Sequence, residues 1–191
     1  MLQQTRVEAV KPYFQRFIRE LPDVASLAAA PEERIVKLWE GLGYYSRVRN
    51  MQKAAIRVME EYNGKIPEDF ETLLSLKGIG RYTAGAISSI AYGHKVPAVD
   101  GNVLRVYSRL TESREDIMKQ SVRKSVEEQL KEIMPEDRPG DFNQAMMEIG
   151  AVVCVPNGKA KCEECPLGRF CLARKHGTVE ELPVKAPKKS Q

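Results

Sequence analysis

Two stretches decide the fold of this chain: Leu76-Lys77-Gly78-Ile79-Gly80-Arg81-Tyr82-Thr83-Ala84-Gly85, and further along Val99-Asp100-Gly101-Asn102. The first lies between segments with helical spacing of apolar residues, so it predicts a turn between two helices. Gly78 and Gly80 allow positive φ and leave their backbone N–H groups uncovered. Because these groups precede a helix N-terminus, the turn suits an anion such as a nucleic-acid phosphate. An ordinary helix corner with a glycine C-cap explains the same residues and stays open here.

Length, charge and hydropathy narrow the class of protein. With 191 residues, 42% of them hydrophobic, the chain is long enough for one domain or two small lobes with a real core. Its net charge of +4 is compatible with DNA binding but does not establish it. No apolar run is long enough to span a bilayer and no signal peptide opens the sequence, so we expect a cytoplasmic protein and no membrane partner.

Apolar residues recur with helical periodicity along nearly the whole chain, and almost no segment alternates like a strand. The sequence therefore predicts an all-α protein. Pro31, Ser46 and Asp100 are expected to start helices, and Gly64 to follow the end of one. Further helices are expected over 69–76, 82–92, 121–134 and 141–153. The last eleven residues, 181–191, hold three lysines and two prolines and indicate a linker.

All four cysteines lie close together, with the spacing Cys154-x7-Cys162-x2-Cys165-x5-Cys171. Such clustering favours a metal site in a reducing compartment over a disulfide framework. A structural zinc site usually has two tight cysteine pairs, and this loop has only one. The loop therefore favours a [4Fe–4S] cluster, with a zinc site of four thiolates as the alternative. Five cations surround the loop and suit a phosphate backbone, although a solvated surface explains each one singly: Lys159, Lys161, Arg169, Arg174 and Lys175.

Taken together, these motifs resemble the helix-hairpin-helix DNA glycosylases, and within them the MutY-type adenine DNA glycosylases. The similarity covers essentially the whole chain, and four further stretches carry it: Met1-Leu2-Gln3-Gln4-Thr5, Gly41-Leu42-Gly43-Tyr44-Tyr45-Ser46, Phe142-Asn143-Gln144-Ala145 and Glu181-Leu182-Pro183. The resemblance implies an all-α fold of two lobes with DNA bound between them. It places a six-helix barrel with the hairpin at 1–95, an iron–sulfur cluster lobe at 96–180 and a linker at 181–191.

The resemblance also assigns roles to single residues. Asp100 matches the catalytic carboxylate and Asn102 a polar residue that assists it, although from position alone Asp100 is a helix N-cap. The four cysteines match the cluster ligands, with one residue more than usual between the first two. The DNA-binding residues that the resemblance implies are Gln4, Tyr44, Lys77, Gly78, Gly80 and Gln144, with Gln4 and Tyr44 entering the base stack.

Tyr82 distinguishes this chain from the related endonuclease III-type enzymes, which have a lysine there and form a Schiff base with the sugar. We count Tyr82 among the catalytic positions. A tyrosine cannot form that imine, and Lys77 on the turn is a poor substitute. The resemblance therefore implies a monofunctional glycosylase.

Cleavage of an N-glycosidic bond requires protonation of the leaving base and stabilisation of positive charge on the sugar. Asp100 suits the second role. In the family the acid is a glutamate two residues before the Met-Leu-Gln-Gln-Thr stretch, and this chain begins at that Met. We therefore expect a chain without the family's N-terminal segment and C-terminal 8-oxoguanine-recognition domain, and impaired in excision.

The expected function is base-excision repair: hydrolytic release of adenine paired with 8-oxoguanine or guanine, by a bacterial, nucleoid-associated monomer that binds double-stranded DNA with a flipped adenine. Three alternatives stay open. The first is a catalytically inert iron–sulfur protein core that binds DNA. The second is an endonuclease III-like glycosylase acting on oxidised pyrimidines, and the third is a structural protein stabilised by zinc.

Overall fold

The computed structural model describes residue 1, residue 5 and residues 7–186, and every regular element within them is a helix. The prediction of an all-α fold is thus confirmed. The chain divides into two compact units, Met1–Gly80 and Arg81–Gln191. The lobe boundary near residue 95 that the resemblance implies stays a prediction.

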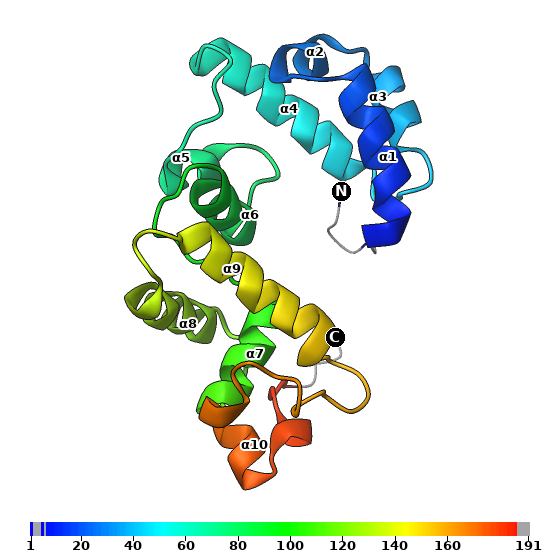
Figure 1. The fold of residues 1–191 in the computed structure, drawn as a ribbon. Coiled ribbons are helices and arrows are strands. Elements are labelled where there is room, and N and C mark those ends of the chain that lie inside the picture. The colour runs from blue at the N-terminus through cyan, green and yellow to red at the C-terminus, as the bar shows by residue number, and fades with distance from the viewer. Residues whose placement is uncertain (2–4, 6, 187–191) are drawn as a thin grey trace. The chain divides into compact units, whose positions relative to one another are not determined.

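The helices of the first unit are α1 (Val7–Glu20), α2 (Val24–Ala29), α3 (Glu32–Trp39), α4 (Ser46–Glu61) and α5 (Phe70–Ser75). Two of them, α2 and α3, pack against the long helix α4, and α1 packs against α3 (Figure 1). Its core is built around Trp39, whose ring meets that of Phe17 edge to face, with ring centroids 6.2 Å apart. Asp69 caps the short helix before the glycine turn by accepting a hydrogen bond from the Thr72 N–H. Tyr45 rather than the expected Ser46 precedes α4 as its cap residue.

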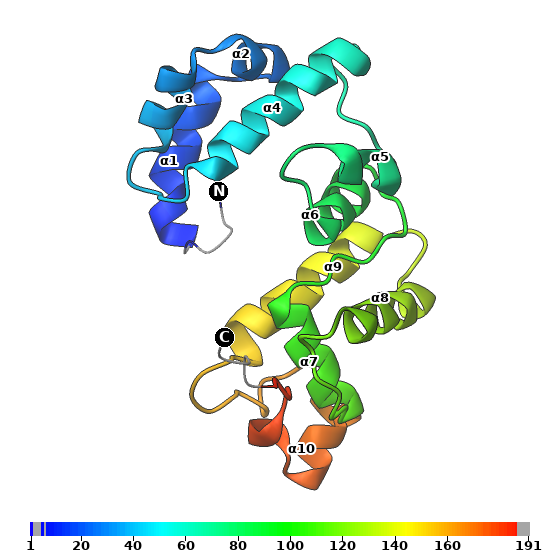
Figure 2. The same ribbon diagram turned by 180° about the vertical axis from the view of Figure 1, so that it is seen from behind.

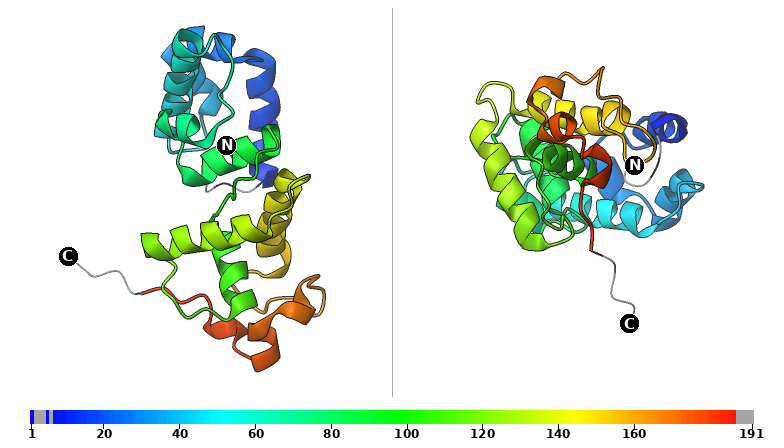
Figure 3. Two further views of the ribbon diagram at one scale, coloured as in Figure 1. Left: turned by 90° about the vertical axis from the view of Figure 1, so that its left-hand side faces the viewer. Right: turned by 90° about the horizontal axis from the view of Figure 1, so that it is seen from below.

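The second unit is organised around α7 (Gly101–Thr111), which contacts α8, α9 and α10 (Figures 2 and 3). Its buried residues include Val103, Leu104 and Val106, which form a core with residues from α8 and α9. The other elements are α6 (Arg81–Ala86), η1 (Ile87–Ala91), α8 (Gln120–Ile133), α9 (Pro139–Glu148), η2 (Ile149–Val153), η3 (Gly168–Phe170), α10 (Leu172–His176) and η4 (Val179–Glu181).

Two predicted helices, 82–92 and 141–153, change their winding before they end. Each finishes in a five-residue π-turn, η1 and η2. At η2 the Cys154 N–H donates to the Ile149 carbonyl across five residues, with N and O 2.7 Å apart. Apolar periodicity does not distinguish such a turn from an α-helical one. A π-turn inside a helix often marks a functional position.

The segment expected to be a linker is packed on the second unit over the part that the structure describes, 181–186. Leu182 is buried, and its carbonyl accepts a hydrogen bond from Arg109 Nε at 3.0 Å. The Ile117 N–H donates to the Val184 carbonyl. Lysine and proline content indicated solvent exposure, but the backbone of this segment is held by tertiary hydrogen bonds. Residues 187–191 lie outside the described part.

No helix in the described part of the chain combines the length and the apolar character needed to cross a membrane.

Asn143 on α9 ties together three segments of the second unit. Its amide nitrogen donates to Ser89 Oγ at 2.7 Å and to the Val96 carbonyl at 2.9 Å, and its oxygen accepts from the Ala98 N–H at 3.0 Å. The side chain is buried, so the bonds to Ser89 and Ala98 lie away from water and the bond to Val96 is partly buried. They fix the extended segment that leads directly into Asp100.

We expect replacement of Asn143 by alanine to lower the free energy of unfolding by about 2–3 kcal/mol, because it leaves buried polar groups without partners. Urea titration followed by circular dichroism measures the effect. The matched control is Gln144→Ala, which alters an exposed neighbour on the same helix. Equal stability of the two variants would contradict the proposed role of Asn143.

Candidate active site and cysteine loop

The glycine turn at the end of the first unit has one position that requires glycine. Gly78 has φ of 83°, and a Cβ atom there would lie 2.7 Å from Asn50 Cβ. Gly80 differs from the expectation, because its φ is not positive and a Cβ atom would meet open space. Lys77, Gly78 and Gly80 are all exposed, which leaves this edge of the turn accessible.

Tyr44 is exposed and its backbone is in the left-handed region, with φ of 47°. That conformation is uncommon for a residue with a side chain, so it needs support from neighbours. Arg47 supplies it: its guanidinium lies over the Tyr44 ring and donates to the Leu42 carbonyl. Trp39 Nε1 donates to the Gly43 carbonyl at 3.0 Å. Gln4 lies outside the described residues.

Asp100 is the N-cap of α7, as its position in the sequence predicted. Its Oδ1 accepts from the Val103 N–H at 2.8 Å and its Oδ2 accepts from Asn102 Nδ2 at 2.9 Å. These two donors fix the directions of both carboxyl oxygens. The group is only partly buried, so an anion held at a fixed angle stays accessible.

Asn102 connects this carboxylate to the cysteine loop through Arg105. Arg105 Nη2 donates to Asn102 Oδ1 at 2.9 Å and to the Gly150 carbonyl at 2.6 Å, while Nε donates to the Cys154 carbonyl at 2.7 Å. Burial lowers the pKa of Arg105, and the negative charges of Cys154 and Asp100 act in the opposite direction.

Tyr82 lies on α6, and its hydroxyl donates to Met147 Sδ at 3.2 Å. Burial raises the pKa of this phenol, and the charge of Asp100 raises it further. The hydroxyl therefore remains protonated at neutral pH. Gln144 is exposed on α9, where its amide donates to the Gly140 carbonyl at 3.4 Å.

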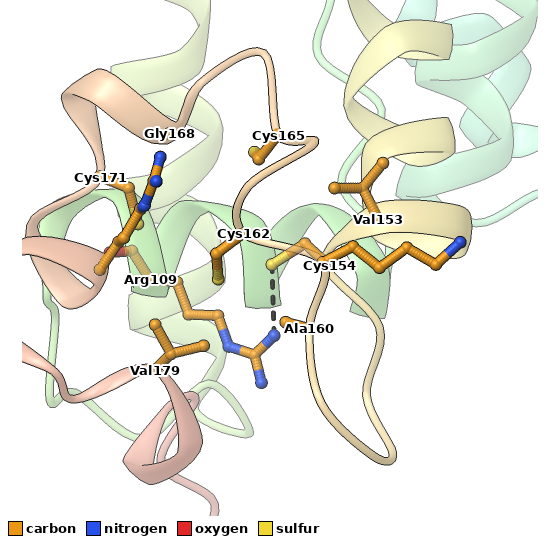
Figure 4. Close-up of a pocket in the computed structure, with 11 residues that line it drawn as sticks. Arg109, Val153, Cys154, Ala160, Cys162, Cys165, Gly168, Cys171 and Val179 are labelled. Carbon is orange, nitrogen blue, oxygen red and sulfur yellow. Dashed lines mark hydrogen bonds between the residues drawn. The ribbon is translucent and has the colours of Figure 1, made fainter.

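All four cysteines line one pocket, together with Arg109 and Arg174 (Figure 4). They are free thiols, and within the described residues no three metal-binding side chains meet closely enough to hold a single ion. Four sulfurs around a shared space suit a cluster that offers a separate iron to each one, better than a zinc ion to which all must converge. Burial, followed by the neighbouring thiolates, raises the pKa of Cys162.

Four residues that connect these groups are not predicted from the sequence: Arg105, Arg109, Asn143 and Gly150. One signal was available for the arginines. They lie four residues apart on one helix, so they share a face with its apolar residues. Arginines on a buried face need hydrogen-bond acceptors for their guanidinium groups. Nothing local to Asn143 or Gly150 indicates their partners, which come from distant segments.

The helical fold, the glycine turn and the helix-capping aspartate together indicate a protein class, which comparison with family models identifies. A family model described as "HhH-GPD superfamily base excision DNA repair protein" matches residues 1–135, and the chain belongs to that superfamily.

Within the superfamily the chain is similar to adenine DNA glycosylases. It is 44% identical to the human enzyme over 95% of this chain and 33% of that protein. It is 38% identical to the enzyme of Buchnera aphidicola subsp. Acyrthosiphon pisum over 100% of this chain and 54% of that protein. The chain thus spans between a third and about half of these relatives.

Solved structures show the same fold. A thermostable thymine-DNA glycosylase superposes with a TM-score of 0.82 at 26% identity, covering 92% of this chain and 80% of that one. An endonuclease III in a non-covalent DNA complex gives a TM-score of 0.76 at 30% identity, covering 91% and 79%.

Gly150 tests how tightly Asn102 is held. A Cβ atom at Gly150 would lie 2.6 Å from Asn102 Cβ, whereas one at Gly101 would meet nothing within 4 Å. We expect Gly150→Ala to destabilise the protein by about 1–3 kcal/mol through overpacking. Gly101→Ala, at the start of the same helix as Asn102, should be neutral or slightly stabilising. Thermal unfolding of both variants measures this, and equal midpoints would show that α7 and η2 separate freely.

Proposed function

We propose that this chain forms the core of an adenine DNA glycosylase, which hydrolyses the bond between adenine and deoxyribose where adenine is paired with 8-oxoguanine or guanine. The similarity to adenine DNA glycosylases supports the reaction class. The observation that carries the proposal is the Asp100 carboxylate, held by the Val103 N–H and the Asn102 amide while it stays partly exposed.

Asp100 then stabilises the positive charge that develops on the sugar as the bond to adenine breaks. Asn102 fixes the direction of Oδ2, so that the anion does not have to reorient during the reaction. Water adds to the sugar and adenine leaves as a neutral base after protonation. The resemblance assigns the donation of that proton to a glutamate of the family.

Tyr82 supports hydrolysis without a covalent enzyme–sugar intermediate. Endonuclease III has been trapped as a covalent intermediate with DNA. The family position that carries a lysine for such chemistry is Tyr82 here, and a phenol forms no imine. Its neutral hydroxyl adds a polar group beside Asp100 with no further charge.

DNA binding is proposed for both units. Gly78, Gly80 and Lys77 offer backbone N–H groups and a cation to a phosphate. Tyr44 offers an exposed ring for stacking, held in place by Arg47, and Gln144 offers an exposed amide. Gln4 is assigned to the base stack by the resemblance alone. We propose a monomer that acts in the bacterial cytoplasm at the nucleoid, on a flipped adenine in double-stranded DNA.

We also propose that Cys154, Cys162, Cys165 and Cys171 bind a [4Fe–4S] cluster. Its four iron–sulfur bonds would cross-link segments of the loop that have little secondary structure of their own. The loop is in turn attached to α7 through Arg105.

Replacement of Asp100 by asparagine tests the proposed reaction. We expect single-turnover adenine release from an adenine:8-oxoguanine duplex to fall about 10²–10³-fold, because the stabilising negative charge is lost. Variant and wild type are compared both as this chain and as a fusion that adds upstream of Met1 the segment carrying the family's glutamate acid. DNA affinity, measured by fluorescence anisotropy, should change little, because asparagine still caps the helix.

The control is Asp23→Asn, which alters another aspartate that caps a helix. Release at the wild-type rate by the Asp100 variant would contradict the proposal and favour a DNA-binding core without chemistry. Capture of the enzyme on DNA by borohydride would instead favour the endonuclease III-like alternative.

The cluster is tested on purified protein. We expect a brown protein with broad visible absorbance and about four iron atoms and four sulfides per chain, both lost after Cys162→Ser. A colourless protein with one zinc per chain would establish the zinc alternative.

A further inference from the structure

Arg109 is a buried cation whose hydrogen bonds converge on the cysteine loop. Its side chain is 6% exposed. Nη1 donates to Cys154 Sγ at 3.2 Å and to the Val155 carbonyl at 3.1 Å, and Nε donates to the Leu182 carbonyl at 3.0 Å. Figure 4 shows the guanidinium directed at Cys154. The backbone carbonyl of Arg109 also accepts from Cys171 Sγ, so this residue contacts the first and the last cysteine of the loop.

Cys154 Sγ is the unusual acceptor among the hydrogen-bond partners of the Arg109 guanidinium. A buried guanidinium normally requires an anion or several satisfied acceptors. Within the described residues no carboxylate pairs with Arg109, and its oxygen acceptors are backbone carbonyls, which carry no net charge. Cys154 becomes a thiolate when it binds metal, and it is then the one acceptor of Arg109 that carries a full negative charge.

We propose that Arg109 donates a charge-assisted hydrogen bond to the Cys154 thiolate in the cluster-loaded protein, and so raises the reduction potential of the cluster and slows the loss of its iron. This inference rests on the proposed [4Fe–4S] cluster. A hydrogen bond and a positive charge at a ligand sulfur stabilise the state with more electrons, because that state puts more negative charge on the sulfur. The same bond makes the sulfur a poorer target for protons that would release it from iron.

Arg174 provides a matched comparison in the same pocket. Its guanidinium also lines the space between the cysteines, but Nη2 is paired with Glu163 Oε2 at 2.7 Å. Its charge is thus paired with a carboxylate, and in the described part of the chain its hydrogen bond goes to oxygen and not to sulfur. Removal of Arg174 changes the net charge of the pocket by the same amount as removal of Arg109, without removing a hydrogen bond to sulfur.

The first test compares Arg109→Gln with Arg174→Gln. We expect Arg109→Gln to lower the reduction potential in an equilibrium redox titration, and to raise the rate of iron release to a chelator about tenfold. Arg174→Gln should shift both much less. Equal shifts in the two variants would overturn the proposal in favour of a general charge effect, and unchanged values for Arg109→Gln would overturn it outright.

The second test uses the wild-type chain and does not depend on the folding of a variant. Arginine is labelled with ¹⁵N, and the cluster is oxidised by one electron with ferricyanide, which becomes ferrocyanide. Pulsed electron paramagnetic resonance should then detect a ¹⁵N nucleus coupled to the cluster in the wild type and in Arg174→Gln. Arg109→Lys, which keeps the charge, should lose that coupling while it retains iron.

Absence of the ¹⁵N coupling in the wild type would overturn the role of Arg109 and leave the cluster itself established. Absence of iron from the wild type would overturn the cluster, and with it this inference. The two failures are thus distinguishable.

Discussion

The arrangement of the second unit depends on the hydrogen bonds of one buried guanidinium, that of Arg105. It reaches the Asn102 amide on its own helix and the Gly150 and Cys154 carbonyls beyond it. A cation removed from water is tolerated only where such acceptors are in place. The direction of the Asp100 carboxylate, which Asn102 fixes, therefore depends on where the backbone before the cysteine loop lies. A change at that backbone is expected to reach Asp100 without any contact to it.

The π-turn η2 is what makes those carbonyls available. Its wider winding directs the Gly150 carbonyl toward Arg105, while the missing side chain of Gly150 lets the turn approach Asn102. The two features work together: a side chain at Gly150 would separate the turn from α7, and Arg105 would then lose an acceptor. A π-turn costs regular hydrogen bonding, so its presence beside the candidate site fits the general association of such turns with function.

Features of the fold and site were predictable from the sequence where a few neighbouring residues determine them. Helical periodicity, the cap formed by Asp100 and the clustering of the cysteines are encoded within a few residues, and the sequence predicted each of them. The two carbonyl acceptors of Arg105, at Gly150 and Cys154, lie more than forty residues away, and a pattern confined to one helix cannot indicate them. Gly80 shows the opposite case: its motif suggested a position that only glycine can occupy, but its φ is not positive and a Cβ atom there would meet open space. The hydrogen bonds of the segment 181–186 were not predictable, because composition indicates solvent preference and not tertiary hydrogen bonds.

Arg105 and Arg109 share a helix face, yet the chemistry of their acceptors separates their roles. Arg105 bonds to carbonyl and amide oxygens, whose charge is the same whether or not metal is bound. Its geometry can thus hold Asp100 in either state. Arg109 bonds to a sulfur, whose charge changes on metal binding. Reversing the two arginines' acceptors would make the orientation of Asp100 depend directly on the charge of the cluster. The observed order places the charge-sensitive bond one helical turn further from the carboxylate.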